Sequence, residues 1–409
     1  MQQRRRPATP FLWGASTAAH QVEGNNLASD WWAREGRQAG MARSGDAVDS
    51  YHRYDEDMRL LAAAGLNAYR FSIEWARIEP VRGEFSRAEL AHYRRMIDTA
   101  ESLGLEPVVT LHHFTTPAWF AEAGGWYAAD AVERFCAYVE RATSILGDVR
   151  FVCTINEPNM LAMMSSLARA AAEGRLDEWQ SPTVEGGRPT VFPAGDEATG
   201  RLLIAAHHAA RDIVRARTNA AVGWTVANTA PEALPGAAGR LAAEQWIRED
   251  LYLEASRDDD FVGVQSYSTM TVGPDGVLPT PYSPTNTLTG VAYRPDALGI
   301  AVRHTTQVTG GMPILVTENG IATPDDSLRI DYTDAALRGL FAAQVDGADV
   351  LGYLHWSLLD NYEWGHWDPT FGLVAVDHET FERRPKPSLS WLGEVAKNDA
   401  AVQRKGTDE

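Results

Sequence analysis

The sequence predicts a single α/β domain folded as a (β/α)8 barrel. Short apolar or β-branched runs alternate with longer segments of helical period along the whole chain. Strands that alternate with helices form a parallel sheet, and eight such units can close into a barrel. The chain has 409 residues, a length that one barrel with long loops accommodates.

Eight runs of strand length define the expected barrel. In chain order they are Phe11–Ala15, Ala68–Ile73, Pro107–Leu111, Phe151–Ile155, Val222–Ala227, Phe261–Val264, Ile314–Thr317 and Val350–Trp356. Residues 10–397 are expected to form the barrel domain. Residues 1–9 are expected as a flexible N-terminal segment and residues 398–409 as a polar C-terminal tail.

The segments between the runs carry helix signals. Ser86 and Glu89 have the spacing of a capping box, which predicts that a helix begins there. Gly65, Gly104 and Gly147 stand where helices are expected to end. Apolar residues at three- and four-residue spacing support two of these helices: Tyr54, Met58 and Leu61, and then Leu90, Tyr93 and Ile97.

Three long connections are rich in glycine, proline and turn residues: Glu173–Gly195, Val272–Pro295 and Ser357–Thr380. Each is expected to follow a strand and precede a helix. In a barrel this position is the C-terminal rim, where active sites lie. We therefore expect these loops to surround a binding site.

Composition excludes several classes of function. The formal charge of −18, from 55 acidic and 37 basic side chains, argues against a nucleic-acid partner. No apolar stretch is long enough for a membrane span, and prolines follow Arg4–Arg6 where a signal peptide needs an apolar run. A cytoplasmic protein with a small-molecule substrate is expected, and a homo-oligomer is left open.

Metal and cofactor motifs are absent from the sequence. The pairs His112-His113 and His207-His208 lack the i, i+4 spacing of metal ligands, and no glycine-rich phosphate loop precedes a helix. Cys136 and Cys153 fit no disulfide framework and are expected as reduced thiols. The expected chemistry therefore comes from side chains, without cofactor or metal.

Two glutamates stand at the carboxyl ends of strand runs. Glu157 stands in Thr-Ile-Asn-Glu-Pro after the fourth run, and Glu318 in Thr-Glu-Asn-Gly after the seventh. Either motif alone is typical of a solvated loop. Two acids on one barrel rim can instead divide the general-acid and nucleophile roles of glycoside hydrolysis.

Six sequence blocks, in order, resemble glycoside hydrolase family 1, the β-glucosidase and β-galactosidase group. The resemblance runs from about Phe11 to Trp391. The blocks are Phe11–Gly24, Tyr69–Ile73, Thr110–Phe114, Thr154–Pro158, Thr317–Gly320 and Trp356–Trp364.

The resemblance implies a retaining mechanism with Glu157 as acid/base and Glu318 as nucleophile. Retention needs the two carboxyl groups about 5–5.5 Å apart. Arg70 is implied beside Glu318, where it favours the ionised form, although a purely structural ion pair is the alternative. Tyr267 is implied as a hydrogen-bond donor to the nucleophile, and Asn156 as the contact for the sugar 2-hydroxyl.

The resemblance also implies a sugar-binding ring. Its members are Gln21, His113, Trp356, Glu363 and Trp364. Trp356 is implied as an apolar floor, with a core tryptophan as the alternative. His113 is preferred to His112 on the family pattern, and Gln21 would otherwise be an ordinary solvated side chain.

The expectation about the substrate is based on Glu363. An anionic carboxylate that faces the 4- and 6-hydroxyls would repel a 6-phosphate. Terminal, non-reducing β-D-glucosides are therefore the expected substrates, with β-D-galactosides and β-D-fucosides as further candidates. A transglycosylase with the same covalent intermediate, or a non-catalytic sugar-binding barrel, are the alternatives.

The chain departs from the family pattern in two places. Gln265-Ser266-Tyr267 stands where the family usually has Asn-Tyr-Tyr, which leaves the geometry around the 2-hydroxyl open. The connection Ile247–Asp260 before the sixth strand is also shorter than usual. The leaving group is therefore not predicted.

Overall fold

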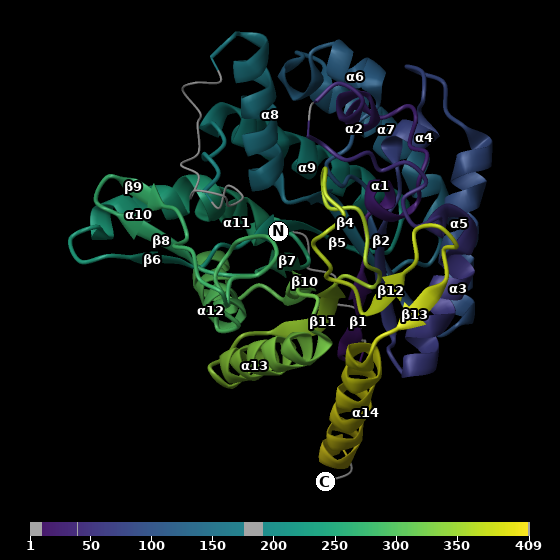
Figure 1. Cartoon of the computed structure of the whole chain (residues 1–409). Coiled ribbons are helices and arrows are strands. Elements are labelled where there is room, and N and C mark those ends of the chain that lie inside the picture. The colour runs from purple at the N-terminus through teal and green to yellow at the C-terminus, as the bar shows by residue number, and fades with distance from the viewer. Residues whose placement is uncertain (1–9, 39, 176–190, 408–409) are drawn as a thin grey trace.

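The computed structural model describes residues 10–38, 40–175 and 191–407. Eight parallel strands close into a barrel in the order β1-β11-β10-β7-β5-β4-β3-β2, with helices around it (Figure 1). The strands are β1 Leu12–Ser16, β2 Ala68–Ser72, β3 Glu106–Thr110, β4 Phe151–Asn156, β5 Ala221–Ala227, β7 Val262–Gln265, β10 Ile314–Asn319 and β11 Val350–Trp356. The predicted (β/α)8 barrel is thus confirmed, and strand ends differ from the predicted ones by at most two residues.

Helices connect and cover the strands. They are α1 Ala19–Val22, α2 Asp30–Glu35, α3 Ser50–Ala64, α4 Trp75–Ile78, α5 Arg87–Ser102, α6 Ala118–Glu122, α7 Ala131–Ala142, α8 Pro158–Ala172, α9 Glu197–Arg217, α10 Ala238–Gln245, α11 Leu251–Ala255, α12 Ala297–Thr309, α13 Asp326–Val345 and α14 Pro387–Thr407. A π-helical turn, η4 Trp246–Asp250, joins α10 to α11. Short 3₁₀ turns are η1 Gly125–Tyr127, η2 Thr143–Ile145 and η5 Ser256–Asp258. Within the described ranges, no helix has the length and apolar character to cross a bilayer.

The predicted helix boundaries have a clear local basis. The Ser86 hydroxyl accepts a hydrogen bond from the Glu89 backbone N–H and caps α5. Gly65 ends α3 in the left-handed conformation, with φ of 96°, which a glycine adopts without a Cβ clash.

Two of the three expected rim loops carry small sheets. Strand β8 Met270–Gly273 pairs with β9 Gly276–Leu278 on one side and with β6 Pro231–Ala233 on the other. Together with α10, this sheet projects to one side of the barrel (Figure 1). Strand β12 Val374–Val376 pairs with β13 Arg383–Pro385.

The third loop differs from the prediction. Residues 173–175, where the expected loop begins, follow helix α8 instead of a strand, because Pro158 begins that helix immediately after β4. Residues 176–190 of the expected loop and residues 1–9, the expected N-terminal segment, lie outside the described residues. At the other end, α14 extends to Thr407.

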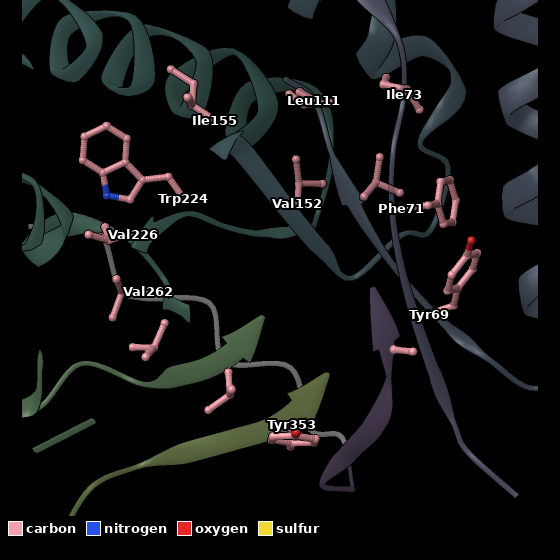
Figure 2. Packing of buried hydrophobic residues seen from close by; sticks show 14 of the residues in the cluster. Tyr69, Phe71, Ile73, Leu111, Val152, Ile155, Trp224, Val226, Val262 and Tyr353 are labelled. Carbon is pink, nitrogen blue, oxygen red and sulfur yellow. The ribbon is translucent and has the colours of Figure 1, made fainter. Parts of the chain in front are cut away.

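Alternation along the strands divides the core into two shells. Tyr69 and Phe71 of β2 point outward and pack with side chains such as Val152 and Trp224 against the helices (Figure 2). Side chains of opposite orientation fill the lower barrel interior, among them Phe151, Cys153 and Phe261. Because strand side chains alternate, Arg70 lies on the inner face between Tyr69 and Phe71. The Arg70 guanidinium is thus buried inside the barrel, above the apolar side chains that fill its lower interior.

Candidate active site

Strand β4 brings Asn156 and Glu157 to the rim of the barrel. The register of β4 with β5 shifts between Cys153 and Asn156, and such an irregularity re-aims the side chains that follow it. Glu157 itself is left-handed, with φ of 43° and ψ of 64°, and serves as the N-cap residue of α8. The β4 end therefore turns sharply at the acid.

Strand β10 carries Glu318 to the same rim. Its register with β7 shifts between Val316 and Glu318, again directly before the acid. Gly320 follows, and a Cβ added there would lie 2.1 Å from the Trp356 carbonyl oxygen. The glycine of the Thr-Glu-Asn-Gly motif is therefore required by close packing of β10 against the end of β11.

Arg70 and Tyr267 each contact one oxygen of Glu318. Arg70 Nη1 donates to Oε1 at 2.5 Å, and Tyr267 Oη donates to Oε2 at 2.6 Å. The Arg70 side chain is buried and its Nε also donates to Thr110 Oγ1 at 3.0 Å. The expected proximity of Arg70 and Tyr267 to Glu318 is thus present in the structure.

The two acids have unequal environments. Burial raises the pKa of Glu157 well above its usual value, and the Glu318 carboxylate raises it further. Burial also raises the pKa of Glu318, but Arg70 and the Tyr267 hydrogen bond oppose that rise. A single proton shared by the pair therefore resides on Glu157.

Asn156 is fixed by donors on three sides. Its Oδ1 accepts from Arg70 Nη2 at 2.6 Å, from Thr225 Oγ1 at 3.0 Å and from Gln265 Nε2 at 3.0 Å. Because the guanidinium can only donate, these bonds orient the Asn156 amide and leave its Nδ2 toward His113 Nε2 at 3.3 Å. The sequence left open what Gln265 does to the geometry around Asn156. In the structure, its longer side chain reaches Asn156 Oδ1 and helps to hold the amide in place.

Aromatic rings line the neighbouring part of the site. The His113 ring lies nearly parallel to the rings of Trp356 and Trp364, with ring centroids 5.9 Å and 6.2 Å away. His112 lies elsewhere, among the core rings of Trp75 and Trp126. The preference for His113 over its neighbour therefore agrees with the observed geometry.

Glu363 and Gln21 supply polar groups to this ring. Trp356 Nε1 donates to Glu363 Oε1 at 3.2 Å, and Asn361 Nδ2 donates to the same oxygen at 3.0 Å. Gln21 is buried, not solvated; its Nε2 donates to the Tyr362 carbonyl at 2.8 Å. Trp356 is buried like a core tryptophan, and its ring nitrogen bonds to Glu363. Its role as the apolar floor of a sugar site stays a prediction.

The charge of Glu363 differs from the expectation. Burial raises its pKa to about 8, and the nearby Glu318 charge adds to the rise against the hydrogen bonds from Trp356, Asn361 and Gln21. Without sugar, the carboxyl is therefore largely protonated at neutral pH. It can then donate one hydrogen bond as well as accept others.

A supporting layer was not predicted from the sequence. Tyr332 Oη on α13 donates to the Tyr267 carbonyl at 2.7 Å, and Asn319 Nδ2 donates to the Ser266 carbonyl at 2.7 Å. Tyr353 Oη in turn donates to Asn319 Oδ1 at 2.9 Å. Asn319 follows Glu318 directly and could have been suspected, whereas Tyr332 and Tyr353 carry no local signal.

In the described parts of the chain, no group of three or more His, Cys, Asp or Glu side chains is placed to hold a metal ion.

A parallel barrel with two buried, unequal glutamates at its C-terminal rim defines the class of barrel glycoside hydrolases. The model of glycosyl hydrolase family 1 matches residues 3–186 and 247–401. The chain belongs to glycosyl hydrolase family 1, whose members are retaining enzymes. Residues 187–246, between the matched parts, lie outside the match.

Named relatives agree with this membership. Thermostable β-glucosidase B of Thermobispora bispora is 30% identical over 95% of this chain and 90% of that protein. A bifunctional β-D-glucosidase/β-D-fucosidase of Bifidobacterium breve is 29% identical over 93% of this chain and 96% of its own length. The solved apo structure of a β-glucosidase termed 1317 is 42% identical, with a TM-score of 0.85, and covers 95% of this chain and 98% of its own.

Proposed function

We propose that this protein hydrolyses terminal, non-reducing β-D-glucosides through a covalent glycosyl-enzyme formed on Glu318. The observation that carries the proposal is the unequal pair of acids. Arg70 and Tyr267 favour the carboxylate of Glu318, while burial and the Glu318 charge keep a proton on Glu157. A nucleophile and a proton donor thus coexist at one pH.

In the first step, a Glu318 oxygen forms a bond to the anomeric carbon as the bond to the leaving oxygen breaks. Glu157 transfers its proton to that oxygen. Glycosylation removes the negative charge of Glu318, so the pKa of Glu157 falls and its carboxylate can accept a proton. Glu157 then deprotonates water, which attacks the anomeric carbon and releases Glu318.

The ring of polar and aromatic groups supports a gluco-configured sugar. We assign Asn156 to the 2-hydroxyl, Trp356 to the apolar face, and the remaining members to the 3-, 4- and 6-hydroxyls: Gln21, His113, Glu363 and Trp364. A protonated Glu363 can accept and donate, which suits hydroxyls of either orientation at carbon 4. β-D-Galactosides and β-D-fucosides are therefore further proposed substrates. The cytoplasmic location and the homo-oligomer stay predictions.

Labelling with a slow 2-deoxy-2-fluoro-β-glucoside tests the proposal. We expect time-dependent inactivation and a single adduct on the peptide that contains Glu318, identified by mass spectrometry. A Glu318→Gln variant provides the control and should remain unlabelled. If the active wild-type enzyme yielded no adduct on that peptide, the assignment of Glu318 would be wrong.

A further inference from the structure

The carboxyl of Glu157 is held in place only through its backbone. It makes no capping bond to the first turn of α8, and among the described residues it has no hydrogen-bond partner. Its backbone N–H donates to the Thr225 carbonyl at 2.7 Å, and its φ of 43° is unusual for a residue with a side chain. The position of this carboxyl therefore depends on what fixes the turn from β4 to α8.

Asn159, two residues later, fixes that turn to two other elements. Its Nδ2 donates to the Ala227 carbonyl at 2.8 Å and to the Arg248 carbonyl at 2.6 Å. Its Oδ1 accepts from the Ala227 backbone N–H at 3.2 Å. Ala227 is the last residue of β5 and Arg248 lies in η4, so one buried amide joins the first turn of α8 to both.

The η4 turn is itself firmly anchored. Arg248 Nε donates to Glu244 Oε2 at 2.8 Å, and its Nη1 donates to the Phe192 carbonyl at 2.9 Å. The buried Glu249 accepts from the backbone N–H and the hydroxyl of Thr229, at 2.7 Å and 2.6 Å. The short connection before the sixth barrel strand thus presents a fixed carbonyl to Asn159.

We propose that Asn159 is a positioning residue for Glu157, an inference that depends on the acid/base role in the proposed function. Its three hydrogen bonds hold the first turn of α8 against β5 and η4, and thereby set the direction of the Glu157 side chain. Displacement of a catalytic group by about 1 Å can slow a reaction on the order of 10²-fold. Asn159 touches no reacting atom in this proposal and acts only through Glu157.

Leaving-group dependence tests the proposal, because proton donation matters only for poor leaving groups. We measure kcat/KM, which reports formation of the glycosyl-enzyme, for phenyl β-glucoside and 2,4-dinitrophenyl β-glucoside. Asn159→Leu removes all three hydrogen bonds at similar volume. We expect it to lower kcat/KM about tenfold more for the phenyl than for the dinitrophenyl glucoside.

Asn67→Leu is the matched control. Asn67 also clamps backbone, since its Oδ1 accepts from the Trp13 N–H at 2.7 Å and its Nδ2 donates to the Phe11 carbonyl at 3.0 Å. It precedes β2, at the opposite end of the barrel, so the ratio of the two kcat/KM values should equal that of the wild type. If Asn159→Leu does not fold, Asn159→Ser removes the same donor amide with a smaller side chain.

Equal losses on both substrates in the folded Asn159 variant, or the same change of ratio in Asn67→Leu, would overturn the positioning role. Neither result touches the proposed function, which fails separately if the wild type cleaves neither glucoside.

Discussion

At the scale of single residues, Glu318, the proposed nucleophile, accepts hydrogen bonds from two donors of different kind. Arg70 brings a full positive charge to one oxygen of Glu318, and Tyr267 brings a neutral hydroxyl to the other. Both lower the pKa of Glu318, and the Arg70 charge has the larger effect. Removing the tyrosine hydroxyl therefore weakens the preference for the carboxylate without leaving a buried cation unpaired.

Tyr267→Phe should move the acidic limb of the pH profile to higher pH. Loss of the hydroxyl raises the pKa of Glu318, so the nucleophile becomes ionised only at higher pH. A hydrogen bond to a charged group contributes roughly 1.5–3 kcal/mol, which corresponds to a loss of about tenfold or more in kcat/KM. The measurement is kcat/KM against pH for 2,4-dinitrophenyl β-glucoside, whose leaving group needs no proton.

The matched control for this prediction is Tyr51→Phe. Tyr51 Oη donates to the Glu89 carboxyl at 3.0 Å, so the same kind of pair is broken away from the site. An acidic limb that stays unchanged in Tyr267→Phe, or that moves equally in Tyr51→Phe, would contradict the assigned role.

Sequence blocks predicted which residues gather at the site but not how they brace one another. The family resemblance implied Arg70 and Tyr267 beside Glu318, and Asn156 at the sugar 2-hydroxyl. Gln265 departs from its motif, and its role depends on how β7 lies between β5 and β10, where it pairs with Ala227 and Glu318. Which side chains meet across neighbouring strands depends on how the strands lie in space. The hydrogen bond from Gln265 to Asn156 therefore had no signal in the sequence.

At the scale of elements, the strands were predictable and their irregularities were not. Strands buried on both faces read as continuous apolar runs, and all eight runs became barrel strands. The register shifts before Asn156 and Glu318 are relations between two strands, and neither partner sequence marks them. Both shifts come directly before a proposed site residue, where a local irregularity re-aims the side chain.

Helix α9 is attached to β4 by a buried polar network. His207 Nδ1 and Thr154 Oγ1 of β4 lie 2.7 Å apart, and His207 Nε2 lies 2.9 Å from Asp259 Oδ2. Arg211 Nη1 donates to Asp259 Oδ1 at 3.0 Å. A single carboxylate therefore satisfies two side chains of α9.

Asp259→Ala should destabilise the fold and leave the chemistry unchanged. Removing one partner of a buried ion pair costs about 3–5 kcal/mol, because the remaining charge is buried without compensation. The measurement is the free energy of unfolding in urea, together with the ratio of kcat/KM for the phenyl and dinitrophenyl glucosides. That ratio should match the wild type, since Thr154 lies on the outward face of β4.

Asp212→Ala serves as the control for this network. Asp212 also approaches Arg211, at 3.3 Å, but its side chain is 70% exposed. The expected change in unfolding free energy is within about 0.5 kcal/mol. Similar losses for the two variants would show that the Asp259 pair is no more important than a surface contact.

At the scale of the whole molecule, buried titratable groups fix how stability depends on pH. Burial raises the pKa of Asp30 to about 6, of Glu74 to about 7 and of Glu363 to about 8. It lowers the pKa of His112 and His355 to about 3. The acids keep protons in the folded state that the unfolded chain has lost, and the histidines lack protons that the unfolded chain binds at low pH.

The unfolding free energy should therefore fall as pH rises from about 7.5 to 8.5. An unfolded histidine has a pKa of about 6.5, so above pH 7.5 the histidines are mostly neutral in both states. The acids then dominate, and the folded state binds more protons than the unfolded one. Closer to pH 6.5 the histidines oppose this trend.

Urea unfolding at the two pH values, for the wild type and Glu363→Gln, measures the effect. The variant cannot ionise at this position, so it should be more stable than the wild type at the higher pH, with a smaller decrease between the two pH values and impaired turnover. A decrease that is unchanged in Glu363→Gln would show that the carboxyl of Glu363 is ionised in the folded protein. Its charge would then face the sugar at neutral pH, and the case for donation to a 4-hydroxyl of either orientation would be lost.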